Sequence, residues 1–324
     1  MKETLPWRPD AELAGFEVQP IEVEVDGVAL RGTLVRAADN PADAERAVLY
    51  VHGLTDYFFH EHLAEAYRNE GIAFFALDLH RFGRSLRDDD RPNYCDSVEE
   101  YFPEIDQAID RIKATGARQL IVNAHSTGGL ILSHYADHGS RRAAIDGLFL
   151  NSPFFDFPMY GPERWALAAL AWLGRWWPYA SYHHGKPSLY AQSIYRGYRG
   201  EWDYNLRIKP DVGFPIHLGW IRAIVNAQKR LQAGLDIRCP VLVMHSARSI
   251  RSLNHWTDDL QAADAVLDVE HMRRYGPGLG DRVSLVEIDG GMHDLVLSQA
   301  GVRKQVFAEL FRWLGQISAE RQAA

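Results

Sequence analysis

The sequence predicts an α/β protein with a mostly parallel, doubly wound sheet that carries helices on both faces. Short continuous apolar runs, which suit strands buried on both sides, alternate along the chain with stretches of helical periodicity. The 324 residues are 47% hydrophobic and 24% charged, a composition typical of a globular domain. Several apolar runs also end in a residue able to do chemistry, and the carboxyl ends of parallel strands meet at one edge of a sheet.

The elements can be placed in order from local patterns. Residues 21–25 and 29–35 alternate in polarity and are joined by Asp26-Gly27, which predicts a hairpin. Buried strands are expected at 47–51, 72–77, 119–124, 145–150, 240–245 and 283–288. Helices are expected at about 60–71, 98–115 and 302–317, where apolar residues recur at helical spacing.

The alternation of strands and helices breaks off between residues 154 and 235. This stretch is rich in Trp, Tyr, Pro and Gly and contains short helical patterns. We therefore expect a core in two parts, residues 1–153 and 236–324, with residues 154–235 forming an aromatic-rich helical lobe inserted after the sixth strand. Most of its rings would form a small core, and others would line an apolar site beneath it.

The most specific motif lies at the end of the strand predicted for 119–124. Ser126 follows this strand at the tip of a sharp turn, and a helical pattern begins directly after it. A nucleophilic serine in such a strand–turn–helix context adopts a strained backbone, so the residues two before and two after it must be small. Here they are Ala124 and Gly128. We interpret Ser126 as a catalytic nucleophile.

A serine hydroxyl needs a base within hydrogen-bond reach. His293 follows the last predicted strand in a Gly-Gly-Met-His turn, as the chain order serine, acid, histidine requires. The acid should follow the strand that ends at His245. No acid occurs directly after it, and the candidates are Asp258, Asp259, Asp264 and Asp268. We favour Asp264, which precedes two apolar residues and a helix start, with Asp268 as the next choice.

The oxyanion of an acyl-transfer reaction needs two backbone donors. We expect them to be the N–H groups of Thr127, directly after the nucleophile, and of Leu54, in the loop after the strand at 47–51. Gly53 would let that loop approach the substrate, and His52 would orient it. His125 lies beside the serine in sequence, but its side chain should point away from it, so we interpret His125 as structural.

At these residues the chain resembles the α/β-hydrolase superfamily, and within it the group of monoacylglycerol lipases, lysophospholipases and serine aminopeptidase-like proteins. The resemblance spans about residues 21 to 317. It is carried by residues 52–54, 78–85, 124–129, 240–245, 264–270 and 291–293. It implies that Ser126, Asp264 and His293 form a catalytic triad, that Leu54 and Thr127 donate to the oxyanion, and that residues 154–235 cover the site.

The chain departs from this family in two places. An extra segment, residues 247–263, separates the strand ending at His245 from Asp264. In the string from Asp78 to Ser85, His80 and Arg81 replace the family's usual Arg and Gly.

Composition excludes several other classes of function. The net charge of −8 argues against a nucleic-acid partner, and Cys95 and Cys239 form no disulfide framework. No signal peptide is expected, and no apolar run approaches the ~20 residues of a membrane-spanning helix. We therefore expect a cytoplasmic protein, for which the aromatic cap would allow transient contact with lipid. The oligomeric state is left open.

No metal and no cofactor are expected. The two histidines of His60-Glu61-His62 are two residues apart on a predicted helix, so they do not share a face. No Gly-x-Gly-x-x-Gly string follows a strand, so a dinucleotide is not predicted.

The sequence thus predicts a serine hydrolase that cleaves small-molecule carboxylic esters through an acyl-enzyme on Ser126. Monoacylglycerol- or lysophospholipid-like esters are substrates suggested by the resemblance, as are other small acyl esters. Two alternatives stay open: an amide or peptide hydrolase with the same triad, and a non-catalytic binding protein with the same fold.

Overall fold

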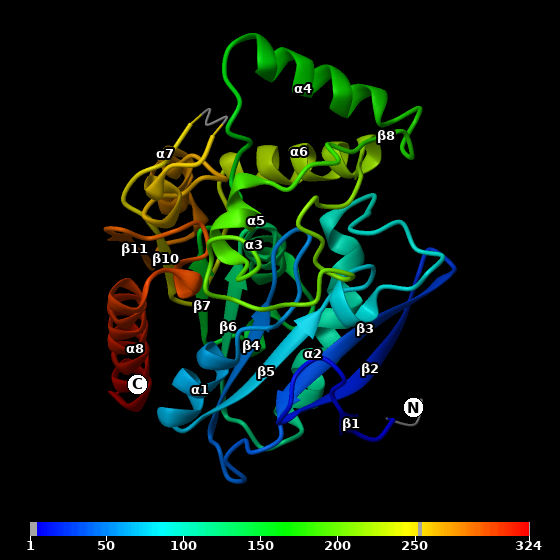
Figure 1. Ribbon diagram of the computed structural model, residues 1–324. Coiled ribbons are helices and arrows are strands. Elements are labelled where there is room, and N and C mark those ends of the chain that lie inside the picture. The colour runs from blue at the N-terminus through cyan, green and yellow to red at the C-terminus, as the bar shows by residue number, and fades with distance from the viewer. Residues whose placement is uncertain (1–4, 252–254, 324) are drawn as a thin grey trace.

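A nine-stranded sheet forms the centre of the protein, seen in a computed structural model that describes residues 5–251 and 255–323 (Figure 1). Its strands are β1 (Arg8–Pro9), β2 (Phe16–Val25), β3 (Val28–Ala37), β4 (Arg46–Val51), β5 (Ile72–Asp78), β6 (Gln119–His125), β7 (Gly147–Asn151), β10 (Val241–Ser246) and β11 (Val283–Ile288). The spatial order is β1-β2-β3-β5-β4-β6-β7-β10-β11. The pairs from β5 to β11 are parallel, which confirms the predicted sheet.

The amino-terminal strands are antiparallel. β2 and β3 form the predicted hairpin, whose turn residues Asp26 and Gly27 have φ angles of 49° and 78°. An Asp-Gly pair tolerates this left-handed conformation, which matches the twist of the flanking strands. β1 was not predicted, because its two residues carry no periodic pattern.

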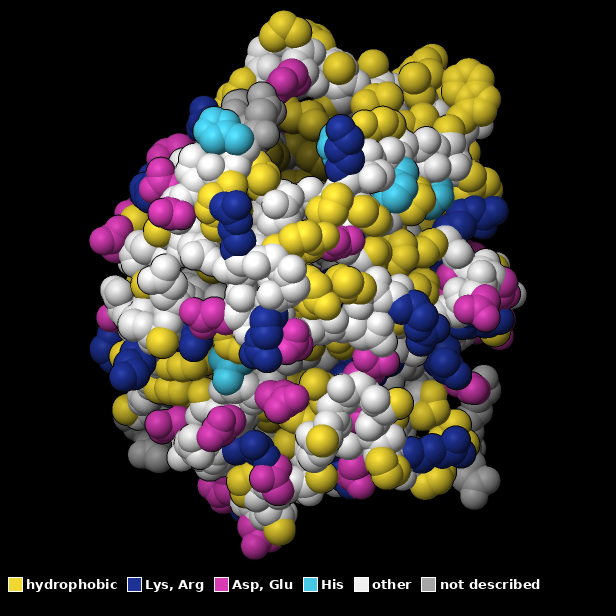
Figure 2. Space-filling model, in the orientation of Figure 1, with side chains coloured by type: hydrophobic (Ala, Val, Ile, Leu, Met, Phe, Trp, Pro, Cys, Tyr) yellow, Lys and Arg dark blue, Asp and Glu magenta, His cyan; other side chains and the backbone are white. Residues whose placement is uncertain are grey.

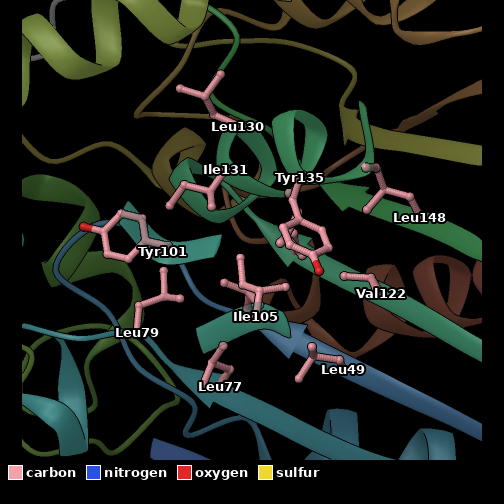
Figure 3. Close-up of a cluster of buried hydrophobic side chains, with 14 of the residues drawn as sticks. Leu49, Leu77, Leu79, Tyr101, Ile105, Val122, Leu130, Ile131, Tyr135 and Leu148 are labelled. Carbon is pink, nitrogen blue, oxygen red and sulfur yellow. The ribbon is translucent and has the colours of Figure 1, made fainter. Parts of the chain in front are cut away.

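Helices cover both faces of the sheet. They include α1 (Glu61–Asn69), α2 (Phe102–Lys113), α3 (Thr127–His138) and α8 (Ala300–Ala323). Leu49 and Val51 of β4 pack with side chains of α2 and α3, as the cluster in Figure 3 shows in part, whereas Val48 and Tyr50 pack with those of α1 and α8. Successive residues of a strand point to opposite faces, so the apolar run of β4 serves both cores.

The helix expected at 98–115 begins as a 3₁₀ turn, because Pro103 lacks the N–H group that an α-helix interior needs and fits only its first turn. Other short 3₁₀ helices occupy Gly83–Ser85, Arg142–Ala144, Asp258–Gln261, Gly276–Leu279 and Leu295–Leu297. α7 (Val269–Tyr275) precedes β11. Within the described residues, no helix has both the length and the apolar character that crossing a membrane demands.

Residues 154–235, which we call the inserted segment, lie between β7 and β10. They contain α4 (Pro162–Leu173), β8 (Ser181–Tyr182), α5 (Leu189–Ile194), β9 (Ile216–His217) and α6 (Leu218–Gln232). α4 lies over α6, and both lie beyond one end of the sheet (Figure 1). The insertion was expected after the sixth strand. It follows β7, which is the seventh strand of the chain because β1, which was not predicted, comes before the others.

Candidate active site

Ser126 occupies the junction between β6 and α3 with φ 51° and ψ −116°. This is a left-handed conformation that a serine rarely adopts, and it indicates a backbone held by its surroundings. Gly128 explains the close packing of the turn, since a Cβ atom there would lie 2.3 Å from the carbonyl oxygen of His52. The small residue inferred from the sequence is thus needed where α3 meets the end of β4.

Three side chains from distant parts of the chain form a continuous hydrogen-bonded series. The Oγ of Ser126 lies 3.1 Å from Nε2 of His293, and Nδ1 of His293 lies 2.9 Å from Oδ2 of Asp264. All three residues are buried. The His293 ring is held between the rings of Tyr190 and His125, with centroids 5.4 Å and 4.8 Å away. This arrangement can pass a proton from a serine hydroxyl to an imidazole.

Asp264 reaches His293 because it pairs with Ser249, three residues beyond the end of β10. The Asp264 N–H donates to the Arg248 carbonyl over 3.0 Å, and the Asp264 carbonyl accepts from Ile250 over 2.8 Å. Its Oδ1 accepts the N–H groups of Val266 and Leu267, each at 2.8 Å. These bonds leave Oδ2 to face the imidazole. The extra residues 247–263 therefore lengthen the loop without moving the acid away from the end of β10.

Asp268, the next candidate acid, has a different environment. Its Oδ1 accepts the N–H of Glu270 over 3.2 Å and caps α7. Its Oδ2 contacts the Tyr160 hydroxyl and the Arg251 guanidinium. The structure brings Asp264, and not Asp268, to His293.

The loop after β4 lies against the serine. His52 Nδ1 donates to the Gly53 carbonyl over 2.8 Å, and its Nε2 accepts the N–H of Leu79 over 3.1 Å, so this ring fixes the loop. A Cβ atom on Gly53 would lie 3.1 Å from the Cβ of Ser126. Leu54 and Thr127 both line the cavity beside Ser126, and neither backbone N–H donates to a residue that the structure describes.

A cavity of about 710 Å³ opens above Ser126 and His293, beneath the inserted segment. Figure 2 shows a hollow below α4 with hydrophobic side chains around it. The apolar part of its wall comes largely from the inserted segment: Phe154, Phe157, Met159, Leu167, Leu170, Leu218, Trp220 and Ile221. A cavity of this size and lining suits a small, mainly apolar ligand.

A polar corner interrupts the apolar wall. Lys209 Nζ lies 2.6 Å from Oδ1 of Asp56, and both side chains are buried. Tyr190, whose ring contacts His293, also lines the cavity. Sequence analysis missed these residues, because Asp56 and Lys209 are far apart in the chain and neither lies in a recognisable motif. The position of Asp56, two residues beyond Leu54, was the one available signal.

A second buried carboxylate lies behind His293. Asp294 accepts from Asn151 Nδ2 over 2.7 Å and pairs with His60 Nε2 at 3.0 Å. Although burial opposes it, the charges and hydrogen bonds of His125, His60 and Asn151 hold the pKa of Asp294 far below its usual range. Burial lowers the pKa of His125 to about 4. Its Nδ1 donates to the Asn151 carbonyl over 3.1 Å, which agrees with a structural role.

Asp78 ends β5 at the carboxyl edge of the parallel strands, but it is not among the residues that line the cavity. Its carboxylate accepts the N–H of Phe58 over 2.9 Å and pairs with Arg84 at 2.9 Å, and Arg84 also pairs with Asp10. The Asp78 carboxylate is therefore engaged by Arg84 and by the backbone of Phe58.

The parallel sheet, the strained serine at a strand–helix turn and the serine–histidine–aspartate series define the protein's class as an α/β-hydrolase. A family model described as "Serine aminopeptidase, S33" matches residues 42–298, so the chain belongs to this family of hydrolases. This finding confirms the resemblance inferred from the motifs. A search of curated protein sequences finds no match.

Solved structures show the same fold. A soluble variant of monoglyceride lipase from Saccharomyces cerevisiae, in complex with a substrate analog, has a TM-score of 0.68 at 17% identity over 93% of this chain and 96% of its own. Monoacylglycerol lipase from Paleococcus ferrophilus has a TM-score of 0.62 at 21% identity over 84% and 94%. A thermophilic esterase from Thermogutta terrifontis has a TM-score of 0.58 at 16% identity over 92% and 99%.

Proposed function

We propose that this protein is a serine carboxylester hydrolase. Ser126 attacks the ester carbonyl while His293 takes its proton, and the carboxylate of Asp264 stabilises the imidazolium that forms. The N–H groups of Leu54 and Thr127 stabilise the oxyanion. His293 then returns the proton to the leaving alcohol, and water releases the acyl group from Ser126.

One observation carries this proposal: the 3.1 Å and 2.9 Å contacts that link Ser126, His293 and Asp264 at the base of an apolar cavity. A purely structural histidine would not need an unshared carboxylate oxygen on one side and a serine hydroxyl on the other. The contacts also weigh against the non-catalytic alternative, whose one supporting feature was the absence of an acid directly after His245.

The cavity suggests how a substrate would lie. The apolar wall formed by the inserted segment would take the acyl chain, and the polar corner of Asp56, Tyr190 and Lys209 would face the leaving alcohol, since Tyr190 contacts the histidine that protonates it. We infer that the substrates are monoacylglycerol- or lysophospholipid-like esters or other small acyl esters. The solved structures named as monoglyceride lipases share this fold and agree with the inference.

Peptide hydrolysis is the second candidate, and the family description favours it. An aminopeptidase, however, needs a free carboxylate to bind the substrate's terminal ammonium group. Asp56 is the acidic residue among the described cavity-lining residues, and Lys209 already neutralises it at 2.6 Å. We therefore favour the ester over the peptide.

Labelling with a fluorophosphonate probe tests the proposal. The wild-type protein should be labelled at Ser126, and Ser126→Ala should abolish both the labelling and the hydrolysis of p-nitrophenyl esters. An ester series of increasing chain length would then measure the acyl site, and matched amides would distinguish the peptide alternative. Absence of labelling in a folded wild-type protein would contradict the proposal.

The inserted segment also supports transient contact with lipid. Between α4 and β8 it exposes seven large apolar side chains: Trp165, Leu170, Trp172, Trp176, Trp177, Tyr179 and Tyr182. α4, which carries Trp165, Leu170 and Trp172, lies above the rest of the inserted segment (Figure 1), and Figure 2 shows hydrophobic side chains on the surface there. We propose that this surface contacts lipid when substrate enters. The cap role of residues 154–235 and a cytoplasmic location stay predictions.

A further inference from the structure

Two histidines and a glutamate meet near the carboxyl end of α3, the helix that begins after Ser126. His134 and His138 are one helical turn apart on the same face, and Glu99 belongs to the 3₁₀ helix at Val98–Tyr101. One ligand atom from each residue lies within 4.8 Å of the others. Neither the family nor the proposed mechanism assigns a role to these three side chains.

The hydrogen bonding of His134 leaves one ring nitrogen free to bind a ligand. Its Nε2 lies 2.9 Å from the Ala227 carbonyl of α6, so that nitrogen carries the hydrogen and Nδ1 keeps its lone pair. Nδ1 is buried and has no hydrogen-bond partner among the described residues, and the side chain is fully buried.

His138 shows the same arrangement with a carboxylate. Its Nδ1 lies 3.1 Å from Oδ2 of Asp137, and its Nε2 is buried without a hydrogen-bond partner among the described residues. Histidines that bind a metal commonly donate their second N–H to a backbone carbonyl or a carboxylate, which fixes the ring and its tautomer. His134 and His138 each have one of these two partners.

The charges around the two rings favour a cation. Glu99 and Asp137 supply two negative charges, against one positive charge from Arg230, whose Nη1 lies 3.6 Å from Glu99 and whose Nη2 lies 3.2 Å from Nδ1 of His138. An arginine side chain only donates, so in this arrangement Nδ1 of His138 accepts from Arg230. Arg230 is half exposed, and when it turns into solvent, Nδ1 of His138 can carry the hydrogen toward Asp137. The carboxyl end of α3 adds the negative end of the helix dipole.

We propose that Glu99, His134 and His138 form a binding site for a divalent transition metal ion, with Zn²⁺ as the best match. Two imidazoles and one carboxylate are a common ligand set for this ion, with a fourth position for water. Tetrahedral binding requires ligand atoms about 3.3 Å from one another. They lie within 4.8 Å here, and rotation of the Glu99 and His138 side chains, which are both partly exposed, would bring them closer. The ion would connect the 3₁₀ helix to α3 and, through Ala227, to α6.

This inference does not depend on the proposed hydrolase function, and it can be tested without an activity assay. Metal-free full-length protein is titrated with ZnCl₂ in a calorimeter. We expect one ion per chain, and at least tenfold weaker binding in Glu99→Gln and in His138→Gln. These residues are used because both are partly exposed, whereas His134 lies in the core.

The matched control is the double variant His183→Gln, His184→Gln, which removes two exposed histidines of the inserted segment and should bind Zn²⁺ as the wild type does. Thermal unfolding without metal checks that each variant folds, and Co²⁺ in place of Zn²⁺ should give the absorption of a tetrahedral complex. Absence of binding to the wild type would overturn the inference. So would equal affinity in the wild type and in both site variants.

Discussion

Asp264 and Asp268 are near neighbours in sequence, and their carboxylates have different partners. Oδ2 of Asp264 faces His293, whereas Asp268 caps α7 and contacts Tyr160 and Arg251. Asp264→Asn should lower the turnover of p-nitrophenyl esters by on the order of 10³–10⁴-fold, because the histidine loses the group that sets its tautomer and stabilises its charge. The measurement is kcat with a soluble short-chain ester.

Asp268→Asn is the matched control, since it makes the same change of charge in a residue nearby. It should leave kcat within about threefold of the wild type, because the asparagine still caps the helix. Loss of activity in Asp268→Asn with no effect in Asp264→Asn would show that the other aspartate is the acid. If neither variant mattered, the proposed mechanism itself would fail.

Gly128 allows a separate prediction about stability. A Cβ atom there would lie 2.3 Å from the backbone oxygen of His52 and 2.8 Å from that of Val51, the last residue of β4, and these atoms cannot move without disturbing the sheet. Gly128→Ala should therefore lower the free energy of unfolding by about 2–4 kcal/mol, measured by urea denaturation. Gly315 lies in α8, and a Cβ atom there would meet nothing within 4 Å. Gly315→Ala should therefore raise the free energy of unfolding by about 0.5–1 kcal/mol, because alanine favours the helix more than glycine does. A similar effect at both sites would contradict the packing argument.

At the scale of secondary structure elements, α4 is unusual because two of its tryptophans are exposed while Leu167 on the same helix is buried. Trp165 is 80% exposed and Trp172 is 64% exposed. Such a surface is costly in water and favourable at a lipid interface, where aromatic side chains concentrate. The double variant Trp165→Ser, Trp172→Ser should weaken co-sedimentation with phospholipid vesicles by about tenfold while it keeps kcat on a soluble ester.

Val28→Ser supplies the control for the α4 variant. Val28 is also exposed, at 52%, but it lies on the β2–β3 hairpin, outside the inserted segment. Its replacement should leave vesicle binding unchanged. Vesicle binding that persists in the tryptophan variant would place the lipid contact elsewhere.

For the whole molecule, buried histidines predict stability that falls on both sides of neutral pH. Burial and the nearby His60 lower the pKa of His62 to about 4 from 6.5. The unfolded chain therefore binds more protons between these values, and stability falls as the pH drops through this range, by on the order of 2 kcal/mol.

Although burial opposes it, the carboxylates of Glu104 and Glu100 raise the pKa of His80 to about 9. Here the folded state binds more protons, so stability falls as the pH rises from 6.5 to 9.

Urea denaturation from pH 4.5 to 9.5 measures both effects. His62→Gln should flatten the acid side of the profile and leave the alkaline side unchanged, and His80→Gln should do the reverse. A profile whose slopes are the same in the wild type and in both variants would assign the pH dependence to other groups.

The sequence by itself determined those features that depend on short stretches of chain. The apolar runs of the parallel strands, the Asp-Gly hairpin turn and the small residues around Ser126 each follow from the local conformation that the residues must adopt. The position of His293 after the last strand followed from chain order. These patterns were sufficient for the fold class and for the expectation of a serine hydrolase.

The tertiary structure alone decided which side chains meet. The pairing of Ser249 with Asp264 beyond the end of β10 brings Asp264 to His293, while Arg84 pairs with Asp78. The pair of Asp56 and Lys209 and the cluster around His134 join segments that share no local pattern. Contacts of this kind depend on the packing of whole elements against one another, a property that periodicity and residue spacing do not encode.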